Sequence, residues 1–371
     1  MKKILILANN DVGLYKFRKE LLEALLKEYE VHIALPDGEF VEKLTEMGCV
    51  FHLTEMSRHG TNPFQDLALM RRYKAIIRKV APQMVLTYTI KPNVYGGMVC
   101  AAKKIPYIPN ITGLGTAVEN KGVLQTVTTV LYRFGLRKAS HVFFQNLDNL
   151  AFMKQKKIVK DNTDLLPGSG VNVSQYLPLP YPATDTVDFV FIARVMKEKG
   201  IDQYLDAAAV ISKQYPQTRF HICGICEEEY QSLLEEKTKA GQITYHGLVG
   251  DMLPIYQMAA CTVHPTYYPE GMSNVLLESC ASGRPIITTD RAGCKEIVDD
   301  GVNGYVCRQQ DSEDLIQKIQ RFLALSHDER RQMGLNGRQK VEQEFDRNIV
   351  VEKYLAAIRR FSKSAKRNQG I

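Results

Sequence analysis

Hydrophobic and polar residues alternate along this chain in two long blocks. In the first block, six short runs rich in apolar residues predict buried strands, at residues 4–8, 31–35, 50–53, 84–88, 107–110 and 142–145. Residues 15–27 and 63–80 carry apolar positions at helical spacing and predict helices between those strands. Strands that alternate with helices are typical of a parallel sheet covered by helices.

The second block repeats this alternation. Its predicted strands lie at residues 189–192, 220–223, 243–246, 261–264, 286–289 and 304–306, and its helices at 201–215, 227–239, 252–259 and 315–325. Ser326 and Glu329 match a capping box that begins a further helix, and residues 349–361 are amphipathic. The sequence therefore predicts an α/β protein with two Rossmann-like, doubly wound domains facing each other across a cleft.

The expected boundary between the domains is a proline-rich segment. Residues 177–182 carry three prolines in six positions, which is typical of a linker. We predict an N-terminal Rossmann-like domain at residues 1–178 and a C-terminal one at 179–348; the motifs below lead us to expect that the first binds the acceptor and the second binds a nucleotide sugar. A C-terminal helix and basic tail at residues 349–371 are expected to pack back toward the first domain.

The most informative motif is the pair Glu270 and Glu278, eight positions apart. A Gly-Met-Ser-Asn run follows Glu270, and the apolar residues 275–281 after it, which include Glu278, predict a helix. Gly283 ends this helix, and Pro285 follows. Glu270 then precedes the helix and Glu278 lies on its second turn, roughly 12 Å away along the axis. This separation exceeds that of a glycosidase carboxylate pair, about 5–9.5 Å.

An elongated ligand with hydroxyl groups at both ends and an anion in the middle fits this spacing. The amides of Gly271, Met272 and Ser273, with Asn274 beside them, are expected to face the anion, because a helix N-terminus offers free N–H groups and a positive dipole end. A nucleoside diphosphate sugar has this layout of sugar, diphosphate and ribose.

Two cations follow the first strand of the second domain. Arg194 and Lys199 lie five positions apart before a helix, and two positive charges match a diphosphate. They are expected to stabilise the leaving diphosphate without a metal ion. Gly13, in the first turn after a strand, permits close approach of the backbone to a ligand, although it lacks the full dinucleotide fingerprint.

Polar loops after other strands supply further candidates. Lys91, Asn93, Thr112 and Gly115 are the expected acceptor-binding residues. The expected donor site also includes three positions that follow strands of the second domain, Gly224, His246 and Leu248, and the loop at His246 is expected to surround the nucleobase. His264 is expected to have a structural hydrogen-bonding role.

Charge and cysteine content refine this interpretation. The net charge is +7, and residues 1–180 hold 24 Lys and Arg against 15 Asp and Glu. This excess favours a partner such as anionic lipid or a phosphorylated substrate over nucleic acid, for which no motif is present.

No apolar run approaches the length of a membrane span, and the eight scattered cysteines are expected to be reduced, so a cytosolic protein is expected. Cys223 and Cys226 form a lone C-x-x-C, for which no metal or redox role is expected.

The chain resembles the retaining glycosyltransferases of family 4, which have the GT-B fold, over essentially its whole length. Residues 269–287 (PEGMSNVLLESCASGRPII) carry the family's E-x7-E motif, and RVMKEKG (194–200), GSGVN (168–172) and AGCKEIVDDGVNGY (292–305) support it. SRHGTNP (57–63) and ITGLG (111–115) resemble bacterial enzymes that extend lipid-linked surface glycans. Many members carry a histidine where this chain has Asn110-Ile-Thr-Gly.

This resemblance implies specific roles. Glu270 contacts the donor sugar, Glu278 binds the ribose, Arg194 and Lys199 bind the diphosphate, and the loop at Gly13 lies beneath it. The implied reaction moves a hexose or N-acetylhexosamine from a UDP-linked donor to an undecaprenyl-diphosphate-linked glycan, with retention and without a metal or other cofactor. The enzyme is expected at the cytoplasmic face of the inner membrane, as a peripheral protein. A UDP-sugar 2-epimerase of the same fold and a non-catalytic sugar-nucleotide-binding protein remain alternatives.

Overall fold

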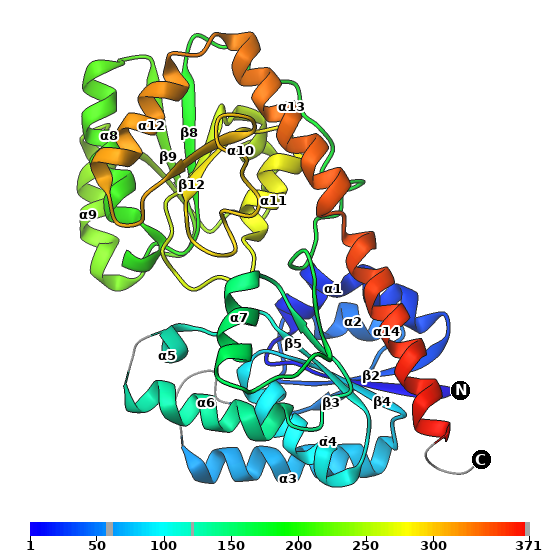
Figure 1. Ribbon diagram of the computed structural model, residues 1–371. Coiled ribbons are helices and arrows are strands. Elements are labelled where there is room, and N and C mark those ends of the chain that lie inside the picture. The colour runs from blue at the N-terminus through cyan, green and yellow to red at the C-terminus, as the bar shows by residue number, and fades with distance from the viewer. Residues whose placement is uncertain (57–61, 120–121, 368–371) are drawn as a thin grey trace. The chain divides into compact units, whose positions relative to one another are not determined.

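The computed structural model describes residues 1–56, 62–119 and 122–367 and divides the chain into two compact units (Figure 1). Unit 1 comprises Met1–Gly170 and Arg347–Ile371, and unit 2 comprises Val171–Asp346. Most of the motif at residues 57–63 lies outside the described residues.

Unit 1 contains a parallel seven-stranded sheet in the order β3-β2-β1-β4-β5-β6-β7. Its strands are β1 (Lys2–Leu7), β2 (Tyr29–Leu35), β3 (Val50–Leu53), β4 (Met84–Tyr88), β5 (Tyr107–Ile111), β6 (Val142–Phe144) and β7 (Thr163–Leu165). Its helices are α1 (Asp11–Leu26), α2 (Val41–Glu46), α3 (Pro63–Val80), the π-helix η1 (Pro92–Gly96), α4 (Gly97–Lys103), α5 (Thr116–Glu119), α6 (Val123–Leu136), α7 (Leu147–Gln155) and α14 (Arg347–Arg367). The six predicted strands are confirmed, and β7 is an additional short strand.

Helices cover both faces of this sheet, because successive strand residues point to opposite sides. Ile4 and Ile6 of β1 pack with residues of α1 and α14, whereas Leu5 and Leu7 pack with residues of α3 and α6. Both faces are apolar, which is why β1 reads as a continuous hydrophobic run instead of an alternating one.

The C-terminal helix α14 is an integral part of unit 1. Buried Arg347 donates to Glu20 Oε2 at 2.9 Å and to the carbonyl oxygen of Gly170 at 3.2 Å. Further along the helix, buried Tyr354 accepts a 2.8 Å hydrogen bond from Asn110 Nδ2 of β5. These contacts explain why the chain returns to unit 1 at residue 347, two residues before the expected start of this segment.

The proline-rich segment at residues 177–182 belongs to unit 2 and is not a linker between units. Arg284 donates to the carbonyl oxygens of Leu179 at 3.3 Å and Pro180 at 2.7 Å, and Tyr181 Oη donates to the Ala260 carbonyl at 3.0 Å. The units instead divide between Gly170 and Val171. Proline composition misplaced this boundary because prolines also occur in extended segments that pack on a domain.

Unit 2 contains a six-stranded parallel sheet in the order β10-β9-β8-β11-β12-β13. Its strands are β8 (Val187–Ile192), β9 (Thr218–Cys223), β10 (Thr244–Gly247), β11 (Cys261–His264), β12 (Ile286–Thr289) and β13 (Gly304–Cys307). Its helices are the 3-10 turn η2 (Lys197–Lys199), α8 (Ile201–Gln214), α9 (Glu228–Lys239), α10 (Leu253–Met258), α11 (Asn274–Ala281), α12 (Ser312–Leu323) and α13 (His327–Glu344). The capping box predicted at Ser326 and Glu329 begins α13.

The strand order changes direction between β8 and β11 in unit 2 and between β1 and β4 in unit 1. Doubly wound sheets bind ligands at such switch points, outside the carboxyl ends of the strands. The loops after β8 and β11 therefore define the region of unit 2 in which a ligand site is expected.

Candidate functional site

The loops after β8 and β11 are held together by backbone contacts. The carbonyl oxygen of Glu198 accepts hydrogen bonds from the amides of Tyr267 and Tyr268, both at 2.9 Å. Gly200, which ends η2 with φ +80°, allows this approach, because a Cβ at this position would lie 2.1 Å from the Pro265 carbonyl oxygen. The RVMKEKG segment thus fits directly against the segment that leads to Glu270.

Lys199 and Glu270 form an ion pair in this region. Their side chains are only 13% and 17% exposed, so the pair is largely shielded from water. The Lys199 ammonium also lies 4.8 Å from the centre of the Tyr268 ring, and the Arg194 guanidinium lies 5.9 Å from the same centre. The structure therefore places the predicted cations Arg194 and Lys199 at one aromatic ring and pairs Lys199 with the predicted Glu270.

Arg194 differs from Lys199 in its freedom to move. Its side chain is 52% exposed, and it forms an ion pair with Glu227 at 3.4 Å, whose side chain is 45% exposed. Exposed pairs of this length contribute little stability. Arg194 can therefore change partner at low cost, whereas Lys199 is fixed by Glu270 and by Tyr268.

Helix α11 begins as the sequence predicts, directly after the Gly-Met-Ser segment. Its first amides, from Asn274 onward, have no acceptor within the helix. Two details differ from expectation: the Ser273 amide donates to the Gly293 carbonyl oxygen at 2.8 Å, and Met272 is buried in an apolar cluster. The Ser273 amide is therefore occupied, and it attaches the loop at residues 292–305 to the start of α11.

Asn274 adds a polar group at the start of α11. Among the described residues, no donor reaches its buried side-chain oxygen Oδ1. A buried acceptor without a partner costs free energy unless a ligand or water satisfies it. This feature supports the expected contact between Asn274 and a bound donor.

Glu278 lies within α11 and is oriented by a buried tyrosine. Tyr256 Oη, at the end of α10, donates to Glu278 Oε2 at 3.1 Å. Burial, together with the negative charge of Glu278, raises the pKa of Tyr256 well above its ordinary value, so the hydroxyl remains a donor. This hydrogen bond orients the Glu278 carboxylate.

His264, at the end of β11, does not have the predicted hydrogen-bonding role. Its side chain is buried, and neither ring nitrogen has a partner among the described residues. Burial, with a smaller effect of the positive charge of Lys199, lowers the pKa of His264 to about 3. The imidazole is therefore neutral at physiological pH, and it adds no third positive charge beside Lys199.

Replacing His264 by phenylalanine should reduce the acid sensitivity of unit 2. A histidine with a lowered pKa in the folded state favours unfolding as the pH falls below its unfolded value of about 6.5. With a folded pKa of about 3, the loss amounts to about 2 kcal/mol between pH 7.5 and pH 5. Urea unfolding followed by circular dichroism at both pH values should show this loss in the wild type and a smaller one in the variant. Equal losses of unfolding free energy in both proteins would contradict a lowered pKa of His264.

The other predicted donor residues lie around β9 and β10. Gly224 follows β9, and a Cβ there would lie 1.8 Å from the Ala193 carbonyl oxygen, so glycine allows this loop to reach the segment of Arg194. The His246 ring takes part in a hydrogen-bond network with His221 and Asp188. His221 Nδ1 lies 3.0 Å from His246 Nε2, and His221 Nε2 lies 2.9 Å from Asp188 Oδ1. Leu248 is 75% exposed and available to a ligand.

In unit 1, Gly13 lies in the first turn of α1, after β1. Its amide donates to Asn10 Oδ1 at 2.6 Å, so Asn10 caps the helix and Gly13 stands close to the cap. This amide is therefore occupied, and a ligand at this turn would meet the neighbouring backbone instead.

The predicted acceptor residues separate into two groups. Lys91 lies after β4, and its ammonium donates to Asp66 Oδ1 at 2.9 Å; Thr112 and Gly115 follow the neighbouring strand β5. Asn93 is fully buried, accepts from Thr87 at 2.6 Å and donates to the Asn110 carbonyl at 2.8 Å. Asn93 thus joins β4 to β5 and does not reach a ligand, which corrects its expected role.

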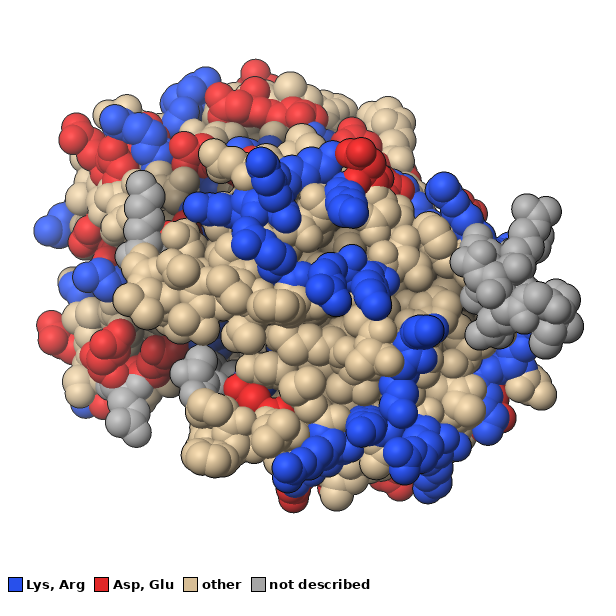
Figure 2. Space-filling model, turned by 60° about the horizontal axis from the view of Figure 1, so that its bottom comes forward, with Lys and Arg blue, Asp and Glu red and all other residues tan. Residues whose placement is uncertain are grey.

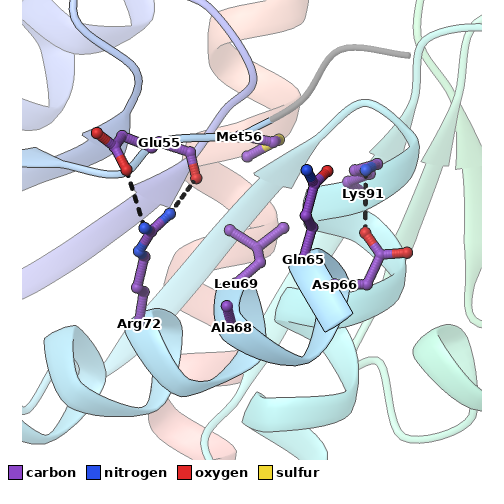
Figure 3. Close-up of a pocket in the computed structure, with 8 residues that line it drawn as sticks. All are labelled: Glu55, Met56, Gln65, Asp66, Ala68, Leu69, Arg72 and Lys91. Atoms are coloured by element: carbon purple, nitrogen blue, oxygen red, sulfur yellow. Dashed lines mark hydrogen bonds and ion pairs between the residues drawn. The ribbon is translucent and has the colours of Figure 1, made fainter. Parts of the chain in front are cut away.

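A pocket of about 300 Å³ opens beside Lys91 (Figure 3). It is lined by Glu55, Met56, Gln65, Asp66, Ala68, Leu69, Arg72 and Lys91. Asp66, one of the two acids there, is held by Lys91 and by Tyr95 Oη at 2.7 Å, and Arg72 donates to Glu55 Oε2 at 2.9 Å. Paired charges around an apolar floor of Ala68 and Leu69 suit a polar ligand with hydroxyl groups.

Sequence reasoning did not identify Tyr256, Tyr268 or Asp66 as site residues. Tyr268 stands two positions before Glu270, but its contact with both cations depends on the fold of two separate loops. Tyr256 lies 22 residues from Glu278, and no local pattern connects them. In the described part of the chain no group of three or more His, Cys, Asp or Glu is arranged to hold a metal ion, and no helix is long and apolar enough to cross a bilayer.

The sequence matches two family models, "Glycosyl transferase 4-like" over residues 3–146 and "Glycosyl transferases group 1" over residues 182–340. The chain is 24% identical over 95% of its length to an N,N'-diacetylbacillosaminyl-diphospho-undecaprenol alpha-1,3-N-acetylgalactosaminyltransferase of Campylobacter jejuni, covering 97% of that protein. It is 23% identical to the capsular polysaccharide biosynthesis glycosyltransferase CapM of Staphylococcus aureus, covering 97% of each chain.

Solved structures share the fold. The Anabaena protein Alr3699/HepE in complex with UDP and glucose superposes with a TM-score of 0.78 at 17% identity, over 96% of this chain and 98% of that one. Sucrose-phosphate synthase from Thermosynechococcus elongatus gives a TM-score of 0.80 at 18% identity, over 98% and 100%. With both family models matched along most of the sequence and the same two-unit architecture, this chain belongs to the family 4 glycosyltransferases of the GT-B fold.

Proposed function

We propose that this glycosyltransferase transfers a hexose or N-acetylhexosamine from a UDP-linked donor to a glycan carried on undecaprenyl diphosphate, during the synthesis of a bacterial surface polysaccharide. The relative from Campylobacter jejuni is named for transfer to a diphospho-undecaprenol-linked sugar, and the relative from Staphylococcus aureus for capsular polysaccharide synthesis. The Anabaena neighbour is described in complex with UDP and glucose. These names support the donor and acceptor classes.

The observation that carries the proposal is the shielded Lys199–Glu270 pair in front of α11. In the proposed complex, the diphosphate lies between Lys199, Arg194 and the first amides of α11. Glu270 accepts hydrogen bonds from hydroxyl groups of the sugar, and Glu278, oriented by Tyr256, accepts from the ribose. A cation pair and a helix N-terminus together stabilise the charge that develops on the leaving diphosphate.

The proposed reaction retains the anomeric configuration by a front-face route. The bond from the anomeric carbon to the diphosphate oxygen breaks while the acceptor hydroxyl approaches from the same side. The acceptor oxygen forms the new glycosidic bond, and its proton passes to the departing diphosphate. Arg194 and Lys199 supply the positive charge, so turnover is expected to persist in the presence of EDTA.

The proposed acceptor region is the pocket beside Lys91 together with the loop at Thr112 and Gly115. Gly115 brings this loop close to Ile90, which precedes Lys91, because a Cβ at Gly115 would lie 3.6 Å from Ile90 Cδ1. The acceptor sugar is expected to contact this region, and its hydroxyl groups have Lys91 and Gln65 as available partners. The enzyme is expected to act at the cytoplasmic face of the inner membrane, where such acceptors carry their lipid.

The direct test is a product assay with a panel of UDP- and GDP-sugars and an undecaprenyl-diphosphate-linked sugar acceptor. Transfer of label from one donor to the lipid fraction, with an axial linkage by nuclear magnetic resonance, is the expected result. The same incubation without acceptor separates the alternatives: a 2-epimerase would convert the donor, and a non-catalytic binding protein would leave it unchanged under both conditions. Either result would contradict the proposal.

Replacing Glu278 by glutamine should weaken donor binding with little change in turnover. An amide cannot accept two hydrogen bonds as strongly as a carboxylate, and a hydrogen bond to a charged group contributes about 1.5–3 kcal/mol. The expected result is a 10- to 100-fold rise in KM for the nucleotide sugar, with kcat reduced far less. Calorimetric titration with the nucleoside diphosphate should show the same loss, and unchanged binding would remove Glu278 from the donor site. Glu313, in the first turn of α12, provides a matched control.

A further inference from the structure

Helix α6 presents a row of large apolar side chains to solvent. Five of them are at least 40% exposed: Val123 (82%), Leu124 (50%), Val127 (44%), Val130 (40%) and Phe134 (53%). The buried residues of the same helix are Thr128, Thr129, Tyr132, Gly135 and Leu136, of which Tyr132 and Leu136 belong to the hydrophobic core of unit 1. The helix is therefore apolar on its exposed face as well, whereas the exposed face of a surface helix is usually polar or charged.

The exposed side chains form one continuous stripe. Val123, Val127, Val130 and Phe134 follow one another at spacings of four, three and four residues, which places them on a single helix face. The opposite face is fixed in place: Tyr107 Oη donates to the Gly135 carbonyl oxygen at 2.8 Å, and a Cβ on Gly135 would lie 2.6 Å from Val94 Cα. The outward orientation of the stripe is therefore set by close backbone packing.

Basic side chains border the C-terminal end of this stripe. Arg133, Arg137 and Lys138 are all exposed, and Arg133 Nη2 donates to the Lys156 carbonyl oxygen at 2.9 Å. That contact places the exposed Lys154, Lys156 and Lys157, at the end of α7, next to α6. Two basic segments of the sequence, residues 133–138 and 154–160, thus lie next to each other in the fold.

The same region contains few negative charges. No Asp or Glu occurs between residues 122 and 147. Figure 2 shows the side of the molecule on which α3, α4 and α6 lie at the bottom of Figure 1, with broad neutral areas, groups of Lys and Arg around them and little Asp or Glu. An apolar stripe bordered by cations is complementary to a surface with an apolar interior and anionic headgroups.

We propose that α6 is a membrane-docking surface, with Val123, Val127, Val130 and Phe134 inserted among the acyl chains and Arg133, Arg137 and Lys138 against anionic headgroups. A second copy of the chain fits less well, because a symmetric contact through this helix would bring the two basic ends or the surrounding cations together. The docking surface goes beyond the transfer reaction, since it requires neither donor nor acceptor.

Flotation with lipid vesicles tests this surface without any sugar nucleotide. The full-length protein should float with vesicles that contain phosphatidylglycerol and much less with vesicles of pure phosphatidylcholine. Flotation with the phosphatidylglycerol vesicles should decrease in 0.5 M salt, because the screening length then falls to between about 3 and 8 Å. The double variant Val127→Ser/Phe134→Ser should reduce the partition coefficient about 10-fold or more. The double variant Arg137→Gln/Lys138→Gln should reduce it about 25-fold, at about fivefold for each charge.

Matched controls come from exposed positions of unit 2. Val302→Ser/Leu335→Ser replaces two exposed apolar side chains and Lys213→Gln/Lys239→Gln removes two exposed positive charges, and both variants should float like the wild type. Transfer to a water-soluble acceptor analogue should be unchanged in all four variants, which separates failure of docking from failure of the proposed reaction. Flotation of either α6 variant at the wild-type level would overturn the proposal. A dimer in analytical ultracentrifugation that Phe134→Ser dissociates, without vesicle binding, would assign the stripe to a second copy.

Discussion

Replacing Lys199 by alanine should lower kcat for sugar transfer about 100- to 1,000-fold. Removing one group that stabilises a developing oxyanion in a shielded site has an effect of this size. Lys199 is largely buried beside Glu270 and Tyr268, so water cannot replace its charge as it can at the exposed Arg194. Steady-state kinetics with a saturating donor measure the effect, and KM for the donor should change less than kcat.

Lys197 provides the matched control for this experiment. It lies on the same 3-10 turn, two residues before Lys199, and its side chain is exposed. The Lys197→Ala variant has the same change in net charge and should retain nearly full activity. If Lys199→Ala and Lys197→Ala transferred sugar at similar rates, the leaving diphosphate would not lie at Lys199, and the proposed donor position would be wrong. Arg194→Ala is expected to show a smaller loss than Lys199→Ala.

Replacing Arg284 by alanine should lower the free energy of unfolding of unit 2 by about 4 kcal/mol. Arg284 is fully buried, and its guanidinium donates to the carbonyl oxygens of Tyr256 at 2.6 Å, Pro180 at 2.7 Å and Leu179 at 3.3 Å. Each buried carbonyl left without a donor costs about 1–3 kcal/mol, and the lost side chain adds a cavity. Burial lowers the pKa of Arg284 to about 10, so it remains charged at neutral pH.

Urea unfolding followed by far-ultraviolet circular dichroism measures this loss, since the chain contains no tryptophan. Arg331, whose side chain is 55% exposed on α13, is the control, and Arg331→Ala should change the unfolding free energy by less than about 0.5 kcal/mol. Arg284→Lys should also be destabilised, because lysine lacks the planar fork that reaches several carbonyls at once. A stable Arg284→Ala variant would show that these carbonyls find other donors.

Arg284 contributes to the stability of unit 2 and also to the orientation of Glu278 in the proposed donor site. It holds the carbonyl of Tyr256, whose hydroxyl orients Glu278, and it holds the proline-rich segment against unit 2. The motif residues 269–287 therefore contain both the carboxylate proposed to bind the ribose, Glu278, and the cation Arg284, which holds the backbone of Tyr256. Donor affinity of a folded Arg284→Lys variant is expected to fall together with its stability.

Local patterns in the sequence were sufficient for the secondary structure and for the main site residues. Buried parallel strands are short apolar runs, and their periodicity is a property of neighbouring residues, so all twelve predicted strands are confirmed within a few residues. The positions of Glu270 before α11 and Glu278 within it also depend only on local signals, the Gly-Met-Ser segment and the ending at Gly283. The short β7 and the helices α2, α4, α5, α6 and α7 were not predicted, and all of these except the 14-residue α6 are too short to have a strong periodicity.

Contacts between distant segments explain the remaining differences. Asn93 looked like a binding residue in a polar loop, but the pairing of β4 with β5 buries it. His264 looked like a hydrogen-bonding histidine, but neither of its ring nitrogens has a partner among the residues that the structure describes. The linker at residues 177–182 was misplaced because Arg284, about a hundred positions later, binds it to unit 2.

The sequence by itself determined that this chain forms two parallel-sheet units, that it resembles a sugar-transferring family, and which acids and cations are candidates for a donor site. These features follow from periodicity and from spacing within single segments. Only the tertiary structure decided that Lys199 pairs with Glu270, that Tyr256 orients Glu278 and that α6 turns an apolar stripe outward. The reason is that strand order and helix packing bring together residues far apart in the chain, and no local pattern records those contacts.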